Sequence, residues 1–181
     1  YWLEGEEGYF IDILTDYAEH QILSEQDAAF NLTIFYGMDA AWADVINACR
    51  RYPMFAEKQV VILKEAQQMR DIEKLEAYVE QPLASTIFVV GHKEKKLDGR
   101  GSMSKLLKKK AEVLTTKKIP DYQLSEWTSR LIHEKGYVIT PRALNLLVDH
   151  IGNDLSRLSN EVDKLVVNLG QRREIQDDDI E

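Results

Sequence analysis

The feature that most constrains the fold is the run Val60-Val61-Ile62-Leu63, in which four large aliphatic residues follow one another without a polar interruption. A strand with one solvated face alternates apolar and polar residues, whereas a continuous apolar run is typical of a strand buried on both faces. Four further strand-like segments alternate with helical patterns, so we predict an α/β fold with a five-stranded, mainly parallel sheet. The five predicted strands are residues 1–4, 31–36, 60–63, 86–91 and 112–115.

The pattern changes near Pro120, after which the apolar repeats have helical spacing. The pair Thr140-Pro141 is a strong helix start, because a hydroxyl side chain can cap the helix and proline is favoured at its first position. We therefore predict an α/β domain over residues 1–119 and a small all-helical domain over residues 120–181. Its last segment, residues 176–181, has the pattern of a further helix start.

The segment before the third predicted strand contains three large apolar residues, Tyr52, Met54 and Phe55. Pro53 fixes its own backbone and disfavours the helical region for the residue before it, so the preceding helix should end here. A short connection of this kind usually runs over the surface. The three side chains are therefore either folded back into the core or displayed to a partner, since interface anchors are commonly aromatic and methionine suits adaptable surfaces.

The sequence motifs do not provide a site for nucleotide hydrolysis. Counting from Gly5, the positions where a phosphate-binding loop needs its second glycine and its lysine hold Phe10 and Ile11. The third predicted strand is followed by Lys64-Glu65, whereas a hydrolase would need an acidic pair there to hold magnesium. Lysine cannot ligate magnesium, so both parts of the site are missing.

The remaining candidates for catalysis or metal binding are scattered along the chain. His133-Glu134 fails as a zinc motif, because Tyr137 stands where the second histidine is needed. The single cysteine, Cys49, shares helical spacing with Val45 and Ile46, which indicates a buried core thiol rather than a nucleophile. We therefore predict no catalytic residue, no metal site and no cofactor.

Charge is distributed unevenly along the chain. The formal net charge is -8, which argues against extensive wrapping of nucleic acid. Residues 93–118, however, contain ten Lys and Arg residues against three Asp and Glu residues, a local net charge of +7. This basic segment either follows a phosphate backbone, with Lys105, Lys108 and Lys109 facing DNA, or forms a solvated loop and helix face. It contains no aromatic residue for base stacking, so any DNA binding should be non-specific and sensitive to salt.

The compartment can be predicted from two features. A single cysteine excludes an internal disulfide and suits the reducing cytoplasm. No apolar run approaches membrane-spanning length, so we expect a cytoplasmic protein without a membrane partner. The sequence begins at Tyr1, without methionine and directly in a strand-like segment, so we expect it to be part of a longer protein.

Several sequence blocks, taken in order, resemble a known family. Each is weak alone, but their order along nearly the whole chain is specific. The blocks are Tyr1–Glu7, Arg50–Val61, Leu97–Arg100 with Lys105–Lys109, and Ile139–Ala143 followed by Gly152–Leu155 and Leu158–Leu165. Together they resemble the delta subunit of the bacterial DNA polymerase III clamp loader.

This resemblance implies an AAA+-type domain without ATPase activity, followed by a small helical lid, with the family's C-terminal collar absent. It implies that Tyr52, Met54 and Phe55, on a loop or short helix, insert into a hydrophobic pocket of the ring-shaped sliding clamp. The chain would then help to open the clamp for loading on primed DNA, together with the other loader subunits. It would not be an enzyme by itself, although it would belong to the DNA polymerase III holoenzyme.

Two alternatives stay open. The chain could be a nucleotide hydrolase with a divergent phosphate site, which measurable ATP binding would favour. It could also be a direct DNA-binding module that uses the basic segment of residues 93–118, which requires a steep loss of DNA affinity with salt.

Overall fold

The computed structural model of this protein describes residues 1–180. The chain divides into two compact units, Tyr1–Lys118 and Ile119–Glu181. Glu181, the last residue of the helix start predicted at residues 176–181, lies outside the described residues. We describe each unit by itself.

A five-stranded sheet forms the centre of the first unit. Its strands are β1 (Trp2–Gly5), β2 (Leu32–Tyr36), β3 (Gln59–Lys64), β4 (Thr86–Lys93) and β5 (Val113–Thr116). The strand order is β2-β3-β4-β1-β5, and every neighbouring pair is parallel. The predicted α/β fold and five-stranded, mainly parallel sheet are therefore confirmed. The apolar run of Val60 to Leu63 forms most of β3 and is fully buried between β2 and β4, as its composition predicts.

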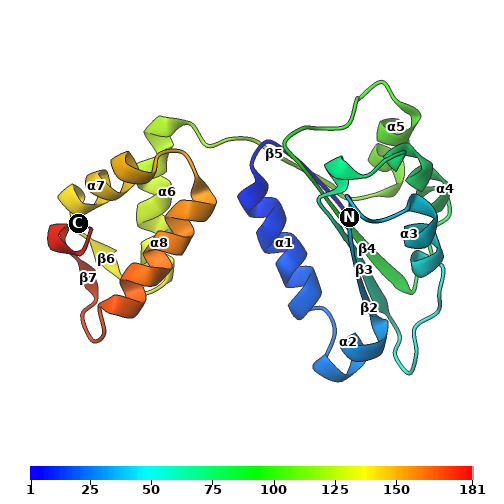
Figure 1. The fold of residues 1–181 in the computed structure, drawn as a ribbon, viewed down its shortest axis with the longest axis horizontal. Coiled ribbons are helices and arrows are strands. Elements are labelled where there is room, and N and C mark those ends of the chain that lie inside the picture. The colour runs from blue at the N-terminus through cyan, green and yellow to red at the C-terminus, as the bar shows by residue number, and fades with distance from the viewer. Residues whose placement is uncertain (181) are drawn as a thin grey trace. The chain divides into compact units, whose positions relative to one another are not determined.

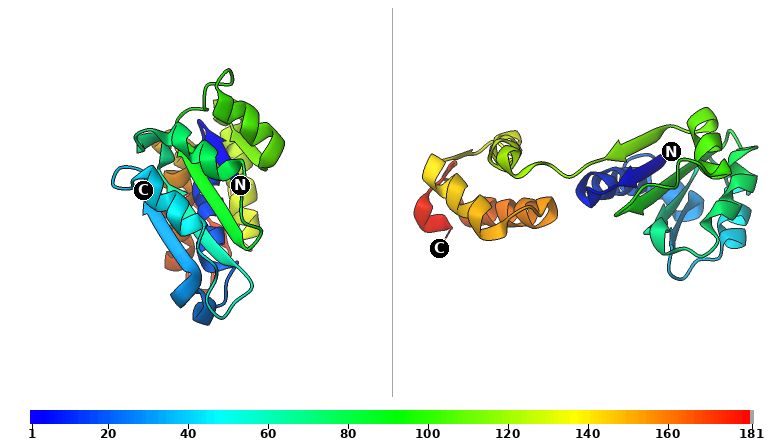
Figure 2. Two further views of the ribbon diagram at one scale, coloured as in Figure 1. Left: turned by 90° about the vertical axis from the view of Figure 1, so that its right-hand side faces the viewer. Right: turned by 90° about the horizontal axis from the view of Figure 1, so that it is seen from above.

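Helices cover both faces of this sheet, with α1 and α2 on one face and α3, α4 and α5 on the other (Figure 1, Figure 2). They are α1 (Gly8–His20), α2 (Glu25–Asn31), α3 (Trp42–Cys49), α4 (Glu76–Val79) and α5 (Ser102–Lys110), and two 3-10 turns, Ala66–Gln68 and Ile72–Leu75, precede α4.

Successive side chains of a strand point to opposite faces of its sheet, so each central strand contributes to two cores. Val61 and Leu63 of β3 pack into the core under α3, α4 and α5, together with Trp2 of β1. Val60 and Ile62 belong to the other core, which α1 covers. This placement explains why β3 needs an apolar residue at every position.

Three helices make up most of the second unit: α6 (Asp121–Glu134), α7 (Pro141–Ile151) and α8 (Leu155–Asn168). The predicted start of α7 is confirmed, because the backbone N–H of Ala143 donates to Thr140 Oγ1 at 3.2 Å and Pro141 is the first helical residue.

The prediction of an all-helical second domain is wrong in one detail. The short strands β6 (Val138–Ile139) and β7 (Glu174–Ile175) form a parallel ladder. Ile175 is fully buried, so β7 adds an apolar residue to the core of this unit. After β7, where a helix start is predicted, the tail forms one turn of 3-10 helix, Asp177–Asp179, with Gln176 as its N-cap.

Among residues 1–180, no helix combines the length and the apolar character that crossing a lipid bilayer requires.

Candidate functional site

The loop between α3 and β3, residues 50–58, displays the three apolar side chains that the sequence singled out. Tyr52 is 77% exposed, Met54 is 53% exposed and Phe55 is 94% exposed. Of the two arrangements left open by the sequence, the structure has the displayed one. Residues 50–58 contain no helical turn, so the expected loop or short helix is a loop. We call residues 50–58 the display loop.

The buried side chain of Gln59 fixes the start of the display loop. Its amide nitrogen Nε2 donates to the backbone carbonyl oxygens of Ala48 at 3.1 Å and Arg51 at 2.5 Å. It also lies 2.8 Å from Thr86 Oγ1, which in turn donates to the carbonyl oxygen of Cys49 at 2.8 Å. The last carbonyl groups of a helix have no partner within the helix. Gln59 and Thr86 therefore end α3 and tie the loop to the sheet.

Asn31, the last residue of α2, holds the middle of the display loop. The backbone N–H of Met54 donates to Asn31 Oδ1 at 2.6 Å, and Asn31 Nδ2 donates to the carbonyl oxygen of Met54 at 2.9 Å. The same Nδ2 donates to the carbonyl oxygen of Asp27 at 3.1 Å, within α2. The side chain of Asn31 is only 3% exposed. Figure 1 shows α2 and the display loop at the same end of the sheet.

Phe55, which follows Met54, has a backbone conformation that is unusual for its residue type. Its φ angle is 55°, in the left-handed region. That region costs a residue with a Cβ roughly 1 to 2 kcal/mol. Because the Phe55 ring is almost fully exposed, its own burial does not offset this strain.

At the opposite end of the sheet, the N-terminus of α1 is occupied by the chain's own carboxylate. Glu7 is the N-cap, and its Oε1 accepts a hydrogen bond from the backbone N–H of Tyr9 at 3.2 Å. Its Oε2 lies 3.4 Å from Lys118 Nζ. A helix N-terminus after the first strand is where a phosphate-binding loop would receive its anion. Here a buried glutamate takes that position.

Lys93, at the end of β4, lies beside Gly8 at this helix N-terminus. The ion-paired residues of this region, which we call the charge cluster, are Glu7, Asp12, Glu65, Lys93 and Lys118. Its Nζ lies 2.6 Å from Asp12 Oδ1 of α1 and 2.5 Å from Glu65 Oε1, which directly follows β3. Gln67 completes the group, because its Nε2 donates to Glu65 Oε2 at 2.7 Å and its Oε1 accepts from the Lys93 backbone N–H at 3.0 Å. Glu65 is therefore held by two side chains of the chain itself, Lys93 and Gln67.

These contacts shift the pKa values of both charged partners. Burial alone would lower the pKa of Lys93, but hydrogen bonds to Asp12 and Glu65 outweigh it and raise the pKa. Burial alone would raise the pKa of Glu65, but hydrogen bonds from Lys93 and Gln67 outweigh it and lower the pKa. Both groups are therefore charged near neutral pH and bound to each other.

The basic side chains of residues 93–118 differ in their surroundings. Lys93 and Lys118 form ion pairs with carboxylates of the charge cluster. Lys105, Lys108 and Lys109, the predicted DNA-facing residues, are all exposed on α5. Other basic residues of the segment are exposed as well, so its exposed positive charge is not confined to the predicted positions: Lys95, Lys96, Arg100, Lys110 and Lys117.

Cys49 is a core residue, as the sequence predicts. It is the last residue of α3, and its side chain is fully buried in the core between this helix and the sheet. Burial raises the pKa of the Cys49 thiol to about 12. The thiol is therefore protonated near neutral pH and shielded from solvent.

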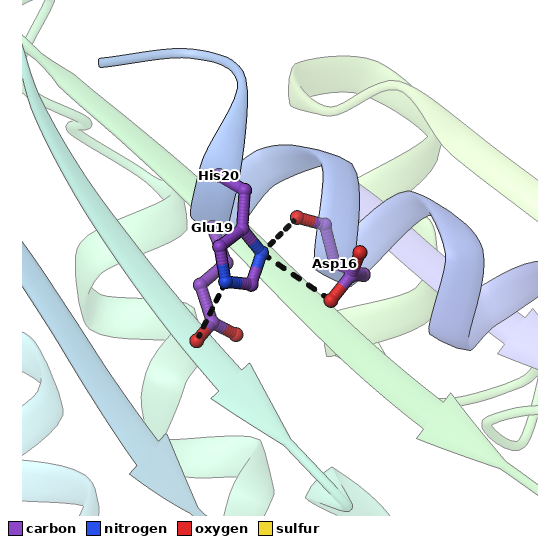
Figure 3. A group of neighbouring side chains, drawn as sticks. All are labelled: Asp16, Glu19 and His20. Carbon is purple, nitrogen blue, oxygen red and sulfur yellow. Dashed lines mark hydrogen bonds and ion pairs between the residues drawn. The ribbon is translucent and has the colours of Figure 1, made fainter. Parts of the chain in front are cut away.

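A group of potential metal ligands, Asp16, Glu19 and His20, lies near the end of α1 (Figure 3). His20 Nδ1 lies 3.3 Å from Asp16 Oδ1, and His20 Nε2 lies 3.8 Å from Glu19 Oε1. Glu19 also forms an ion pair with Lys64. Because the three side chains contact one another and Glu19 also contacts Lys64, we interpret the cluster as polar contacts at the end of α1 and assign it no ligand.

Asn31 is a residue that the sequence patterns did not identify as part of the display loop's surroundings. Asn31 lies 23 positions before Met54, and an isolated asparagine before an apolar run is read as a strand end. Phe30, also unpredicted, precedes Asn31 and is 67% exposed. No local pattern marks these residues, because their role depends on contacts between distant segments.

Comparisons with known proteins agree with the sequence resemblance. Residues 1–117 match the family described as DNA polymerase III, delta subunit. The chain is 26% identical to the DNA polymerase III subunit delta of Bacillus subtilis over 190 aligned positions, covering 99% of the chain and 55% of that protein. The chain thus spans about half the length of this curated relative.

Solved structures give the same family and a wider fold group. The DNA clamp loader delta protein of Bacillus subtilis matches with a TM-score of 0.73 and 26% identity, over 99% of this chain and 56% of that one. The Thermotoga maritima RuvB Holliday junction branch migration motor matches with a TM-score of 0.56 and 16% identity, over 99% of this chain and 58% of that one. At that identity the likeness concerns the fold alone, which is of the AAA+ type.

Proposed function

Because this chain belongs to the DNA polymerase III delta subunit family, we propose that it is the clamp-binding part of a clamp-loader subunit. Its first unit would bind the ring-shaped sliding clamp through the display loop, with Met54 and Phe55 as the main anchors and Tyr52 beside them. The second unit, residues 119–181, would serve as the lid. Further partners would be the other loader subunits and primed DNA.

The observation that carries this proposal is the exposure of three large apolar side chains on one anchored loop. Burying a side chain of this size contributes roughly 1.5 to 3 kcal/mol, so leaving three in water forgoes a large stabilisation unless a partner covers them. A cluster of this kind matches the composition of interface hot spots, in which aromatic residues dominate. An apolar pocket on the clamp is the chemical counterpart that the loop requires.

Binding through this loop would assist ring opening by selective stabilisation. A ligand shifts a conformational equilibrium only by its differential affinity for the two states. The display loop would therefore need to bind a clamp with a loosened subunit interface more tightly than a closed one. Changes elsewhere in the loader would expose or cover the loop.

The direct test is retention of this chain by the purified sliding clamp of the same organism. We expect the immobilised clamp to retain the wild-type chain, and free clamp to compete it off. A folded chain that shows no saturable retention at micromolar clamp would contradict the proposal.

We further propose that the chain is not an ATPase, because the charge cluster lies at the N-terminus of α1, where a phosphate would bind. Glu7, Asp12 and Glu65 supply three carboxylates there against the ammonium groups of Lys93 and Lys118. This excess of negative charge would repel a triphosphate, and Glu7 already caps α1. We expect calorimetric titration with magnesium and ATP to give no saturable heat. A stoichiometric binding curve would favour the alternative of a divergent nucleotide hydrolase.

The exposure of Lys105, Lys108 and Lys109 on α5 favours a secondary contact with DNA inside the loader complex. We expect replacement of all three by glutamine to weaken association with primed DNA in the presence of the clamp. The logarithm of the DNA association constant should also fall less steeply with the logarithm of the salt concentration. The slope should decrease in magnitude by up to about 0.9 for each phosphate that a lysine no longer neutralises. Lys164→Gln, at an exposed lysine of the second unit, is the matched control. An unchanged salt slope in the triple variant would exclude the contact.

A further inference from the structure

Asn31 contacts the display loop in a way that resembles one rung of a sheet. Its side-chain amide bonds both the N–H and the carbonyl group of Met54, at 2.6 Å and 2.9 Å. A side-chain amide has the donor and the acceptor needed for this pairing, whereas a shorter hydroxyl or a carboxylate lacks one of them or the reach. The third bond, to the carbonyl oxygen of Asp27, fixes the amide against α2.

The orientation of α2 is itself fixed locally. Ser24 caps the helix, because its Oγ accepts a hydrogen bond from the backbone N–H of Asp27 at 3.1 Å. Asn31 is buried at the other end of α2, directly before β2. The amide therefore projects from a short helix that is capped at its start and joined to the sheet at its end. Because the Asn31 amide is fixed in this way, its hydrogen bonds restrict the positions that the backbone of Met54 can adopt.

The strained backbone of Phe55 lies immediately after this contact. A residue keeps a sparsely populated conformation only where its surroundings determine it. Phe55 is 94% exposed, so the constraint must come through the backbone of its neighbours. Met54 is fixed by Asn31 on one side of Phe55, and on the other Lys58 Nζ donates to the carbonyl oxygen of Ala84 at 2.6 Å.

We propose that Asn31 is a positioning residue for clamp binding, which holds Met54 and Phe55 in their displayed arrangement before the clamp arrives. This inference rests on the proposed function of the display loop. A loop that is already ordered loses less conformational entropy on binding than a mobile one, so its affinity is higher. Asn31 does not itself need to touch the clamp.

The test replaces Asn31 with leucine, which has a similar volume and no hydrogen-bonding group. We expect Asn31→Leu to weaken clamp binding about tenfold, because two hydrogen bonds of roughly ordinary strength no longer hold the loop in its binding-ready form. Asn153→Leu is the matched control: Asn153 Nδ2 donates to the carbonyl oxygen of Ile119 at 2.7 Å in the second unit, so it should affect stability without changing clamp affinity. Both affinities are measured by titration with purified clamp.

Amide hydrogen exchange separates positioning from general stability. In Asn31→Leu, the Met54 amide should exchange faster, while the amide of Val61 in β3 should keep its wild-type rate. Equal rates for Met54 in the two proteins would overturn the inference, as would wild-type clamp affinity in the folded variant. If Asn31→Leu does not fold, the inference is tested by amide hydrogen exchange in the wild-type chain. Its Met54 amide should then exchange more slowly than its Phe55 amide, and equal rates would overturn the inference.

The failures of the two proposals can be told apart. If the wild-type chain binds the clamp and Phe55→Ala weakens it, but Asn31→Leu binds normally, the function stands and the positioning role is wrong. If the wild-type chain does not bind the clamp, both proposals are overturned.

Discussion

Replacing Phe55 with alanine is expected to weaken binding to the sliding clamp by roughly 1 to 4 kcal/mol, while the chain stays folded. The ring is 94% exposed, so its removal takes almost nothing from the core. In the proposed complex the same ring would fill an apolar pocket, and truncation would leave that pocket partly empty. Isothermal titration of the clamp with each protein measures the loss, and circular dichroism reports the fold.

Tyr122→Ala is the matched control for this variant, because Tyr122 is an aromatic residue of the second unit that is 82% exposed. It should bind the clamp as the wild type does. Unchanged affinity of Phe55→Ala, with a native circular dichroism spectrum, would remove the display loop from the interface. Met54→Ala should show a loss in the same range, since its side chain belongs to the same loop.

The second large effect is expected at Gly5, where substitution by alanine should destabilise the first unit strongly. Gly5 has a φ of 135°, a conformation that side chains with a Cβ rarely adopt. A Cβ at this position would also lie only 2.1 Å from the carbonyl oxygen of Thr116 in the neighbouring strand β5. Strain of roughly 1 to 3 kcal/mol and a similar overpacking cost should both apply. Equilibrium urea unfolding measures the change.

Gly99→Ala is the control for Gly5→Ala, because a Cβ at Gly99 would meet no atom within 4 Å. It should change the free energy of unfolding by less than about 1 kcal/mol. If Gly5→Ala unfolds at the same urea concentration as the wild type, the result would contradict the close contact between β1 and β5 at Gly5. The backbone conformation and the close contact with β5 therefore explain the glycine at position 5 without a phosphate-binding role.

The sheet could be predicted because its signals are local. The continuous apolar run of β3 reports burial on two faces, and this burial is what the structure has. Thr140 and Pro141 likewise mark the start of α7 through chemistry confined to one turn. Patterns of this kind depend on neighbours in the sequence, so they can be recognised without knowing the fold.

Elements that depend on distant partners escaped prediction. The seven-residue helix α2 is too short for a clear apolar repeat, and it was not predicted. The ladder of β6 and β7 has two residues in each strand and forms only because the chain returns after α8. Lys93 was counted with the basic segment, but its partners Asp12 and Glu65 come from other parts of the sequence.

The candidate site was only partly predictable for the same reason. Composition identified Tyr52, Met54 and Phe55 as unusual but left their burial undecided, and their role in binding the clamp comes from the family resemblance and stays a prediction. Asn31 carries no signal in the sequence, since a single asparagine before a strand is unremarkable. Its contact with Met54 joins segments 23 positions apart.

The placement of β3 separates the two ends of the first unit. The display loop leads into β3 at Gln59, and Glu65 of the charge cluster follows directly after Lys64. Six residues of extended strand put these two ends roughly 20 Å apart. Substitutions that far apart, without shared partners, usually have additive effects. The charge cluster and the display loop can therefore change independently in evolution, because substitutions at one end of β3 leave the contacts at the other end unaltered.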